Sequence, residues 1–226
     1  MTGAIRLCCL LLLIAPAAAS AQRAFGPDRQ AGDRYDDTFR KYSKRFFGAG
    51  YEWKVFKAQA MAESNLNPRA RSHVGARGLM QLMPSTYRQV QSRNSELRSI
   101  DDPEWNIAAG IEYDRYLWQL WNDHETDLDR RSFMFGSYNA GRATILRAQA
   151  AARRDSLDHR KWQSIEIVAP RVRGWRHGET LTYIRRIDGN VGQLTGQDSL
   201  AARAELDRAR GLLDLRRYRH AGGEAP

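Results

Sequence analysis

Residues 52–68 read EWKVFKAQAMAESNLNP and predict a helix that ends just after an acidic residue. Trp53, Phe56 and Ala60 recur at helical spacing, and the Asn-Pro pair that closes the stretch stops a helix. A helix is therefore expected from about Glu52 to Ser64. It places the glutamate of the Ala-Glu-Ser triplet in its last turn.

The surrounding sequence predicts further helices and almost no strand. Asp102-Pro103 marks a helix start, with Asp as N-cap and Pro at the first position, and an apolar stripe follows to about Trp121. Alternating strand patterns are nearly absent. One mostly α-helical domain is expected over residues 34–190. Its other predicted helices are one capped by Asp33 that runs through Phe47, one opened by Pro84, and three over about 131–138, 142–152 and 179–187.

The two ends of the chain are predicted to lie outside this domain. Residues 1–21 resemble a secretory signal peptide, in which Arg6 precedes an apolar run and a small-residue cleavage site near 19–21. The run is shorter than the roughly 20 residues of a membrane span, so a retained anchor is the less favoured alternative. Residues 22–33 are expected to form a flexible lead-in, and residues 191–226 a basic tail that is helical in part. The protein is therefore expected to be exported to the periplasm.

The composition of the chain limits the partners and the catalytic groups that can be expected. The formal net charge of +10 suits an acidic polymer as partner, but no zinc-finger or RNP-type motif is present, so nucleic acid is not expected. Cys8 and Cys9 are the only cysteines and lie in the predicted signal peptide, which excludes thiol nucleophiles and a disulfide framework in the mature protein. The histidines show no metal-ligand spacing. No metal and no cofactor are expected.

Four short segments carry candidate chemistry: Glu63-Ser64, GLMQLMP at 78–84, YNAG at 138–141, and Glu179-Thr180 with Tyr183-Ile184. Their order and spacing resemble the catalytic domain of the soluble lytic murein transglycosylase family, which is similar to goose-type lysozyme in fold. The resemblance extends over about 125 residues. It implies a lysozyme-like single domain with a substrate groove.

The resemblance also implies an activity. Enzymes of this family cleave the β-1,4 bond between N-acetylmuramic acid and N-acetylglucosamine in peptidoglycan glycan strands. The C6 hydroxyl of the muramic acid attacks C1, which forms a 1,6-anhydro sugar without water. Glu63 would be the single general acid and base. The residues that the resemblance implies for substrate binding are Ser72, Gln81, Met83, Tyr138, Asn139 and Glu179.

The position of Glu63 supports this role on physical grounds. Burial and the negative end of a helix dipole both disfavour a carboxylate, so its pKa is expected to lie above the reference of about 4.3. Ordinary glycosidases use two carboxyl groups, but no second acidic residue stands in an obvious partner motif. Asp101 and Asp102 are attributed to helix capping. Glu179 begins a helix, where the dipole favours a permanent anion.

Three of these binding residues have more specific expectations. The Tyr138 hydroxyl is expected to hold Glu63 or the glycosidic region. Gln81 and Asn139 can each donate and accept hydrogen bonds, which suits an N-acetyl group.

Two other functions stay open at this point. One ordered water in place of the C6 hydroxyl would make the same scaffold a hydrolytic muramidase. Alternatively, the basic domain is a catalytically idle peptidoglycan-binding module of an envelope secretion or pilus apparatus. The intact Glu63-Ser64 and GLMQ motifs count against the idle module. In each case a monomer is expected.

Overall fold

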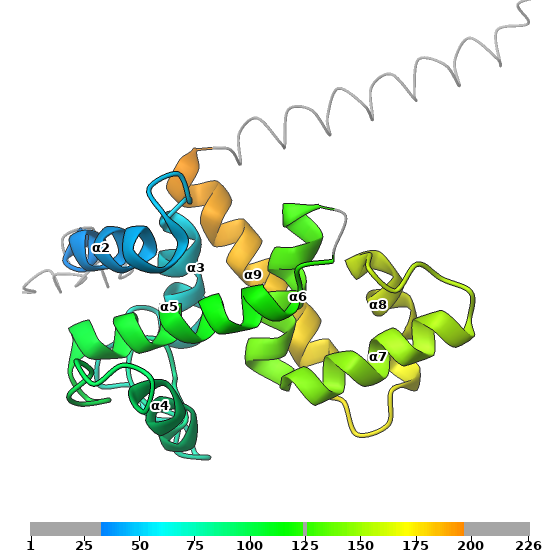
Figure 1. The fold of residues 1–226 in the computed structure, drawn as a ribbon, viewed down its shortest axis with the longest axis horizontal. Coiled ribbons are helices and arrows are strands. Elements are labelled where there is room, and N and C mark those ends of the chain that lie inside the picture. The colour runs from blue at the N-terminus through cyan, green and yellow to red at the C-terminus, as the bar shows by residue number, and fades with distance from the viewer. Residues whose placement is uncertain (1–32, 124–125, 197–226) are drawn as a thin grey trace, which may run out of the picture.

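The computed structural model describes residues 33–123 and 126–196, and this part of the chain is all-helical (Figure 1). It contains eight α-helices, one 3-10 turn and no strand, which confirms the predicted fold class. The elements are α2 (Asp36–Phe47), α3 (Lys54–Ser64), α4 (Pro84–Gln91), α5 (Pro103–Leu120), α6 (Asp127–Ala140), α7 (Arg142–Arg154), α8 (Trp162–Val168), η1 (Ala169–Arg171) and α9 (His177–Thr195).

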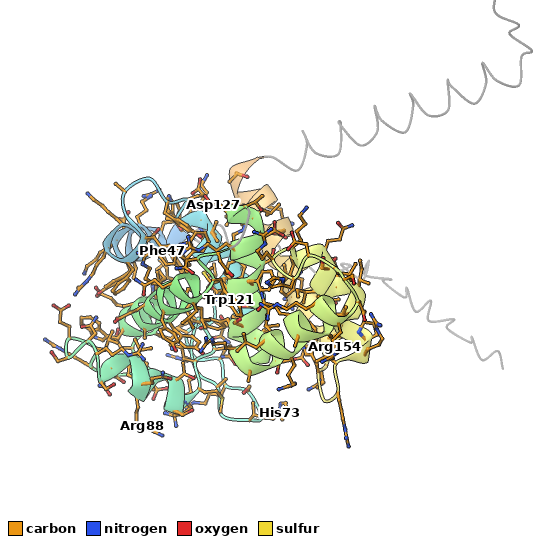
Figure 2. All side chains as sticks on the ribbon, turned by 45° about the vertical axis from the view of Figure 1, so that its right-hand side comes forward. Phe47, His73, Arg88, Trp121, Asp127 and Arg154 are labelled. Carbon is orange, nitrogen blue, oxygen red and sulfur yellow. The ribbon has the colours of Figure 1, made fainter. Side chains whose placement is uncertain are left out.

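Helices α3, α5, α6 and α9 form the centre of the fold. Helix α3 packs along α9, and α6 contacts α5, α7 and α9. Fully buried side chains such as Phe56, Ile107, Phe133 and Ile187 come from these four helices and join one hydrophobic cluster. Trp121 lies in the middle of the molecule and donates from Nε1 to the Ser137 hydroxyl at 3.1 Å (Figure 2). Burial of this apolar surface is the main force that brings the helices together.

The segment between α3 and α4 has no regular structure and is held from α5 by Asn106. The Asn106 side chain accepts from Met80 N at 2.8 Å and donates to the carbonyl of Arg77 at 3.0 Å. A Cβ at Gly78 would lie 2.5 Å from Asn106 Nδ2, and Gly78 has a φ of +75°. Only glycine fits this approach without a shift of the loop. Asn106 therefore fixes the path of the GLMQ segment.

Several predicted helix starts are correct. Pro84 opens α4 at its first turn, and Asp102 caps α5 by accepting from the backbone N–H groups of Glu104 and Trp105. Asp101 is not a cap, contrary to the prediction. It pairs instead with Arg71 at 3.1 Å.

Asp33 is likewise no cap, because α2 begins at Asp36. Asp33 and Asp36 both face the buried Lys57 ammonium, at 3.5 and 2.6 Å. A buried ammonium needs counterions, so these carboxylates serve a long-range contact that the local pattern does not contain.

Other boundaries also differ from the predictions. Helix α6 begins four residues before the expected start at Arg131, because Thr126 caps it by accepting from Asp129 N. Helix α9 runs on to Thr195, past the domain end expected at residue 190. Helix α8 was not predicted at all. The expected signal peptide and nearly all of the lead-in and tail lie outside the described residues. Within the described part, no helix is long and apolar enough to cross a bilayer.

Candidate active site

Glu63 lies in the last turn of α3, where the sequence predicts it. The helix ends because Asn65 and Leu66 adopt left-handed backbone angles, with φ of 52° and 59°. The Ser64 hydroxyl donates to the carbonyl of Leu79 at 2.8 Å. The end of α3 is therefore fastened to the GLMQ segment, and Glu63 is carried on a fixed element.

A pocket opens directly over Glu63. It has a volume of about 350 Å³ and is formed by α3, α6 and α9. A neighbouring hollow also has Asn139 and Glu179 in its lining, so the two lie next to each other. The residues that line the first pocket are Ala62, Glu63, Asn139, Gly178, Glu179, Thr182, Tyr183 and Arg186.

The Glu63 carboxyl is half-buried, and its pKa is raised to about 7. Burial is the largest cause, because it removes water from the charged form. The Tyr183 hydroxyl and the Arg186 guanidinium act in the opposite direction and lower the pKa. The balance leaves a carboxyl group that exchanges a proton near neutral pH.

Two tyrosine hydroxyls lie around this carboxyl. The buried Tyr183 hydroxyl faces Glu63 closely enough to lower the pKa of Glu63, as a hydrogen-bond donor does. Within the part of the chain that the structure describes, this hydroxyl reaches full hydrogen-bonding geometry with no group. The Tyr138 hydroxyl was expected to hold Glu63 or the glycosidic region. It donates instead to the carbonyl of Met80 at 2.7 Å. Tyr138 thus supports the wall of the site from α6.

Asn139 and Glu179 meet Glu63 in the same pocket, although they come from α6 and α9. The Asn139 side-chain oxygen accepts from the Thr180 hydroxyl at 2.8 Å, which orients its amide nitrogen. Glu179 stands in the first turn of α9 and pairs with Arg176 at 3.0 Å, with both side chains well exposed.

The other three predicted binding residues lie on the loop before α4 and at its N-cap, outside the residues that line this pocket. Ser72 accepts from Ala76 N at 2.9 Å and so shapes a tight turn. Gln81 has a φ of 44° and donates to the carbonyl of Gly78 at 2.9 Å. Met83 is an exposed methionine, with 38% of its surface accessible.

Sequence reasoning missed Asp114 and Tyr113, and it quoted Tyr183 without a role. Asp114 is fully buried on α5, and the charge of Glu63 raises its pKa further above the ordinary range than burial alone. The Tyr113 ring packs against Tyr138 at 5.5 Å. An aspartate within the apolar stripe of α5 was the available signal.

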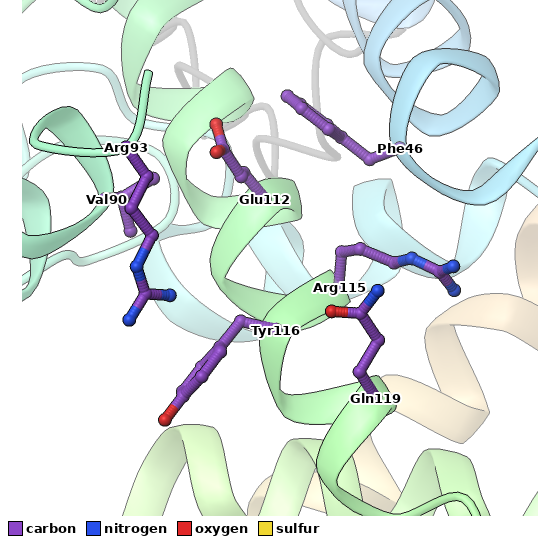
Figure 3. A pocket seen from close by; sticks show the side chains of 7 residues that line it. All are labelled: Phe46, Val90, Arg93, Glu112, Arg115, Tyr116 and Gln119. Atoms are coloured by element: carbon purple, nitrogen blue, oxygen red, sulfur yellow. The ribbon is translucent and has the colours of Figure 1, made fainter. Parts of the chain in front are cut away.

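A separate hollow is lined mainly from α2, α4 and α5 and shares no residue with the pocket over Glu63 (Figure 3). Arg93 lies over the Tyr116 ring at 4.6 Å, and Arg115 and Glu112 stand nearby. Its lining contains none of the residues predicted for the site, whereas the pocket over Glu63 brings Glu63, Asn139 and Glu179 together. The candidate active site is therefore the Glu63 pocket.

No group of three His, Cys, Asp or Glu residues is placed to hold a metal ion in the part of the chain that the structure describes.

Comparison with known proteins finds matches to transglycosylases. The family model "Transglycosylase SLT domain" matches residues 39–161, more than half of the 226 residues. A membrane-bound lytic murein transglycosylase F of Desulfosudis oleivorans is 33% identical over 134 residues, which are 59% of this chain and 28% of that protein. The corresponding protein of Shewanella pealeana is 30% identical, over 66% of this chain and 29% of its own length.

Solved structures show the same relationship. The 70 kDa soluble lytic transglycosylase of Escherichia coli is 27% identical, with a TM-score of 0.54, over 72% of this chain and 24% of that chain. An inactive mutant of the lytic transglycosylase Slt from Pseudomonas aeruginosa, at 22% identity and a TM-score of 0.58, supports the fold alone. The match spans less than a third of these relatives' own length.

Proposed function

Because the chain belongs to the transglycosylase SLT domain family, we propose that it is a peptidoglycan lytic transglycosylase with Glu63 as its single general acid and base. It cleaves the β-1,4 bond between N-acetylmuramic acid and N-acetylglucosamine and leaves a 1,6-anhydromuramyl end. The observation that carries this proposal is the half-buried Glu63 carboxyl. It lines an open pocket, and its pKa is raised to about 7.

The first step uses the protonated form of Glu63. Its proton passes to the glycosidic oxygen while the bond from that oxygen to C1 of the muramic acid breaks. The leaving sugar departs with a free hydroxyl group. The acetamido oxygen of the muramic acid stabilises the positive charge at C1. Glu63 is then a carboxylate, and the Arg186 guanidinium and Tyr183 hydroxyl favour that charge.

The second step uses the carboxylate. It takes the proton of the C6 hydroxyl, whose oxygen bonds to C1 and closes the anhydro ring. Glu63 is protonated again. The reaction consumes no water and needs no second carboxyl group. A pKa near the working pH suits both steps, because one group must give and then take a proton.

The other site residues bind and orient the glycan strand. Asn139, held through its oxygen by Thr180, presents its amide nitrogen to an acetamido carbonyl. Glu179 lines the same pocket and pairs with Arg176. Ser72, Gln81 and Met83 shape the groove along the loop, and Tyr138 holds that loop in place.

Mass spectrometry of digested sacculi tests the reaction type. The lyase releases muropeptides that end in 1,6-anhydro-N-acetylmuramic acid and are one water lighter than hydrolysis products. A predominance of reducing-end N-acetylmuramic acid would instead identify a hydrolytic muramidase. If purified protein clears no peptidoglycan in a zymogram at any pH, the protein is the idle wall-binding module.

Export to the periplasm is part of the same proposal, because the substrate lies outside the cytoplasm. Residues 1–21 supply the cleavable signal peptide. N-terminal sequencing of the protein from a periplasmic fraction should find a start near residues 20–22. A mature chain that keeps Met1 would contradict cleavage.

A further inference from the structure

A second carboxyl group lies in the core close enough to Glu63 to feel its charge, and it is not among the residues that line the open pocket. Asp114 comes from the middle of α5 and has no solvent-accessible surface. Its Oδ1 accepts from Gln59 Nε2 at 3.4 Å. Gln59 belongs to α3 and precedes Glu63 by one helical turn, so these two side chains project from the same face of that helix.

Asp114 and Gln59 together have more hydrogen-bond acceptors than donors. Asp114 Oδ2 and Gln59 Oε1 are both buried, both are acceptors, and neither has a donor among the described residues. A buried acceptor without a partner costs about 1–3 kcal/mol. One proton on Asp114 Oδ2 would let the carboxylic acid donate to Gln59 Oε1. It would complete a cyclic acid–amide pair with two hydrogen bonds.

The surroundings of Asp114 favour this neutral form. No ammonium or guanidinium group of the described residues pairs with it, and the groups that act on it are Gln59 and Glu63 of α3. The buried hydroxyls of Tyr138 on α6 and Tyr183 on α9 belong to the same cluster, as does the neighbouring Tyr113. Burial and the Glu63 charge both raise the pKa of Asp114.

We propose that Asp114 is a positioning residue for Glu63: a neutral carboxylic acid that pairs with Gln59 through two hydrogen bonds. The pair ties the Glu63-bearing face of α3 to α5 and adds no charge near the catalytic carboxyl. An anion there would oppose the carboxylate form of Glu63 that the second step requires. The inference rests on the proposed function for its kinetic part, whereas the protonation state of Asp114 can be measured without any activity.

Three variants separate the possibilities, because Asp, Asn and Leu have nearly the same branched shape. Asp114→Asn keeps two hydrogen bonds to Gln59 and needs no proton. Asp114→Leu removes both bonds and leaves the Gln59 amide buried without a partner. Asp114→Leu combined with Gln59→Met removes both polar groups, so that no unpaired group remains.

The variants should affect stability and turnover differently. Asp114→Asn should keep a kcat close to that of wild type, and the alkaline limb of its pH profile should coincide with that of wild type. Asp114→Leu should lower kcat roughly tenfold to a hundredfold with little change in KM, since Glu63 loses its exact placement. The double variant should recover the melting temperature but not kcat.

Two results would overturn the inference. If Asp114→Asn moves the alkaline limb to lower pH, wild-type Asp114 is an anion that raises the pKa of Glu63. If the double variant regains wild-type kcat together with its melting temperature, Asp114 serves only to fill space.

Infrared difference spectroscopy of wild type against Asp114→Asn at neutral pH provides the independent measurement. A carbonyl stretch of a protonated carboxyl group, lost in the variant, is expected, and a carboxylate signal would contradict the proposal. If wild type forms no anhydro product, the proposed function fails, but the infrared result still decides the state of Asp114.

Discussion

The Tyr138 hydroxyl donates a hydrogen bond of 2.7 Å to the backbone carbonyl of Met80 and so ties helix α6 to the loop that follows α3. The same loop is held from α3 by Ser64 and from α5 by Asn106. Three helices therefore fix one irregular segment beside Glu63. A site assembled this way depends on contacts that are distant in sequence.

Tyr138→Phe removes one of these fastenings. Met80 is fully buried, so loss of the donor leaves its carbonyl under-satisfied, and we expect about 1–3 kcal/mol lower stability. Turnover should fall as the loop loses its support. Urea unfolding and sacculus digestion measure both effects. Tyr116→Phe is the matched control, because this ring lines the separate hollow and its hydroxyl makes no hydrogen bond among the described residues. Equal losses in both variants would contradict the role given to Tyr138.

Gly78→Ala should disturb the same loop from the other side. The added methyl group would lie 2.5 Å from the Asn106 amide nitrogen. The alanine would also have to adopt a φ of +75°, which side chains disfavour. Gly75→Ala separates the two effects, because Gly75 has a φ of +91° with open space around its missing Cβ. Gly75→Ala should lose about 1 kcal/mol from the backbone alone, and Gly78→Ala distinctly more. Thermal melts compare them, and equal destabilisation would show that contact with Asn106 is unimportant.

The pH profile follows from the proton on Glu63. The first step needs the protonated acid, so kcat/KM should fall as the pH rises through about 7. The free energy of unfolding should also fall as the pH rises. The folded pKa of about 7 lies above the unfolded value near 4.5, so the folded state binds the proton more tightly. The contribution of Glu63 to stability is therefore full below about 4.5 and is lost as the pH rises from there through about 7.

Arg186→Gln tests the electrostatic part of this profile. The guanidinium lowers the pKa of Glu63, so its loss should move the alkaline limb to higher pH. Arg185→Gln removes an exposed charge that does not act on Glu63, and it should leave the limb in place. A pH–rate series on all three proteins is the measurement. A limb that moves downward in Arg186→Gln would contradict the assignment of the limb to Glu63.

Local signals in the sequence predicted a large part of this structure. The Asn-Pro pair after α3, Pro84 and the Asp102-Pro103 start are short-range features, and each marks a helix boundary to within a few residues. Glu63 could be found because its place at a helix end and the motif around it are both local.

The remainder depends on contacts between distant segments. Asp33 and Asp36 serve the buried Lys57 ammonium, and nothing near them in sequence indicates it. The pairing of Asp114 with Gln59 arises only when α3 and α5 pack together. The same holds for the Tyr138 hydroxyl, whose acceptor is a backbone atom that no sequence pattern marks.

Glu63→Gln tests the central claim most directly. The amide has nearly the same shape and removes a group whose ionisation burial disfavours, so the variant should fold normally and melt above wild type at pH 8, though not at pH 4. Formation of 1,6-anhydro muropeptides should fall by at least the 10²–10⁴ typical of a lost general acid and base, while sacculus binding survives. Glu179→Gln, measured in parallel, should retain far more turnover. Substantial residual anhydro product from a well-folded Glu63→Gln protein would contradict the account and would move the proton transfer to another group.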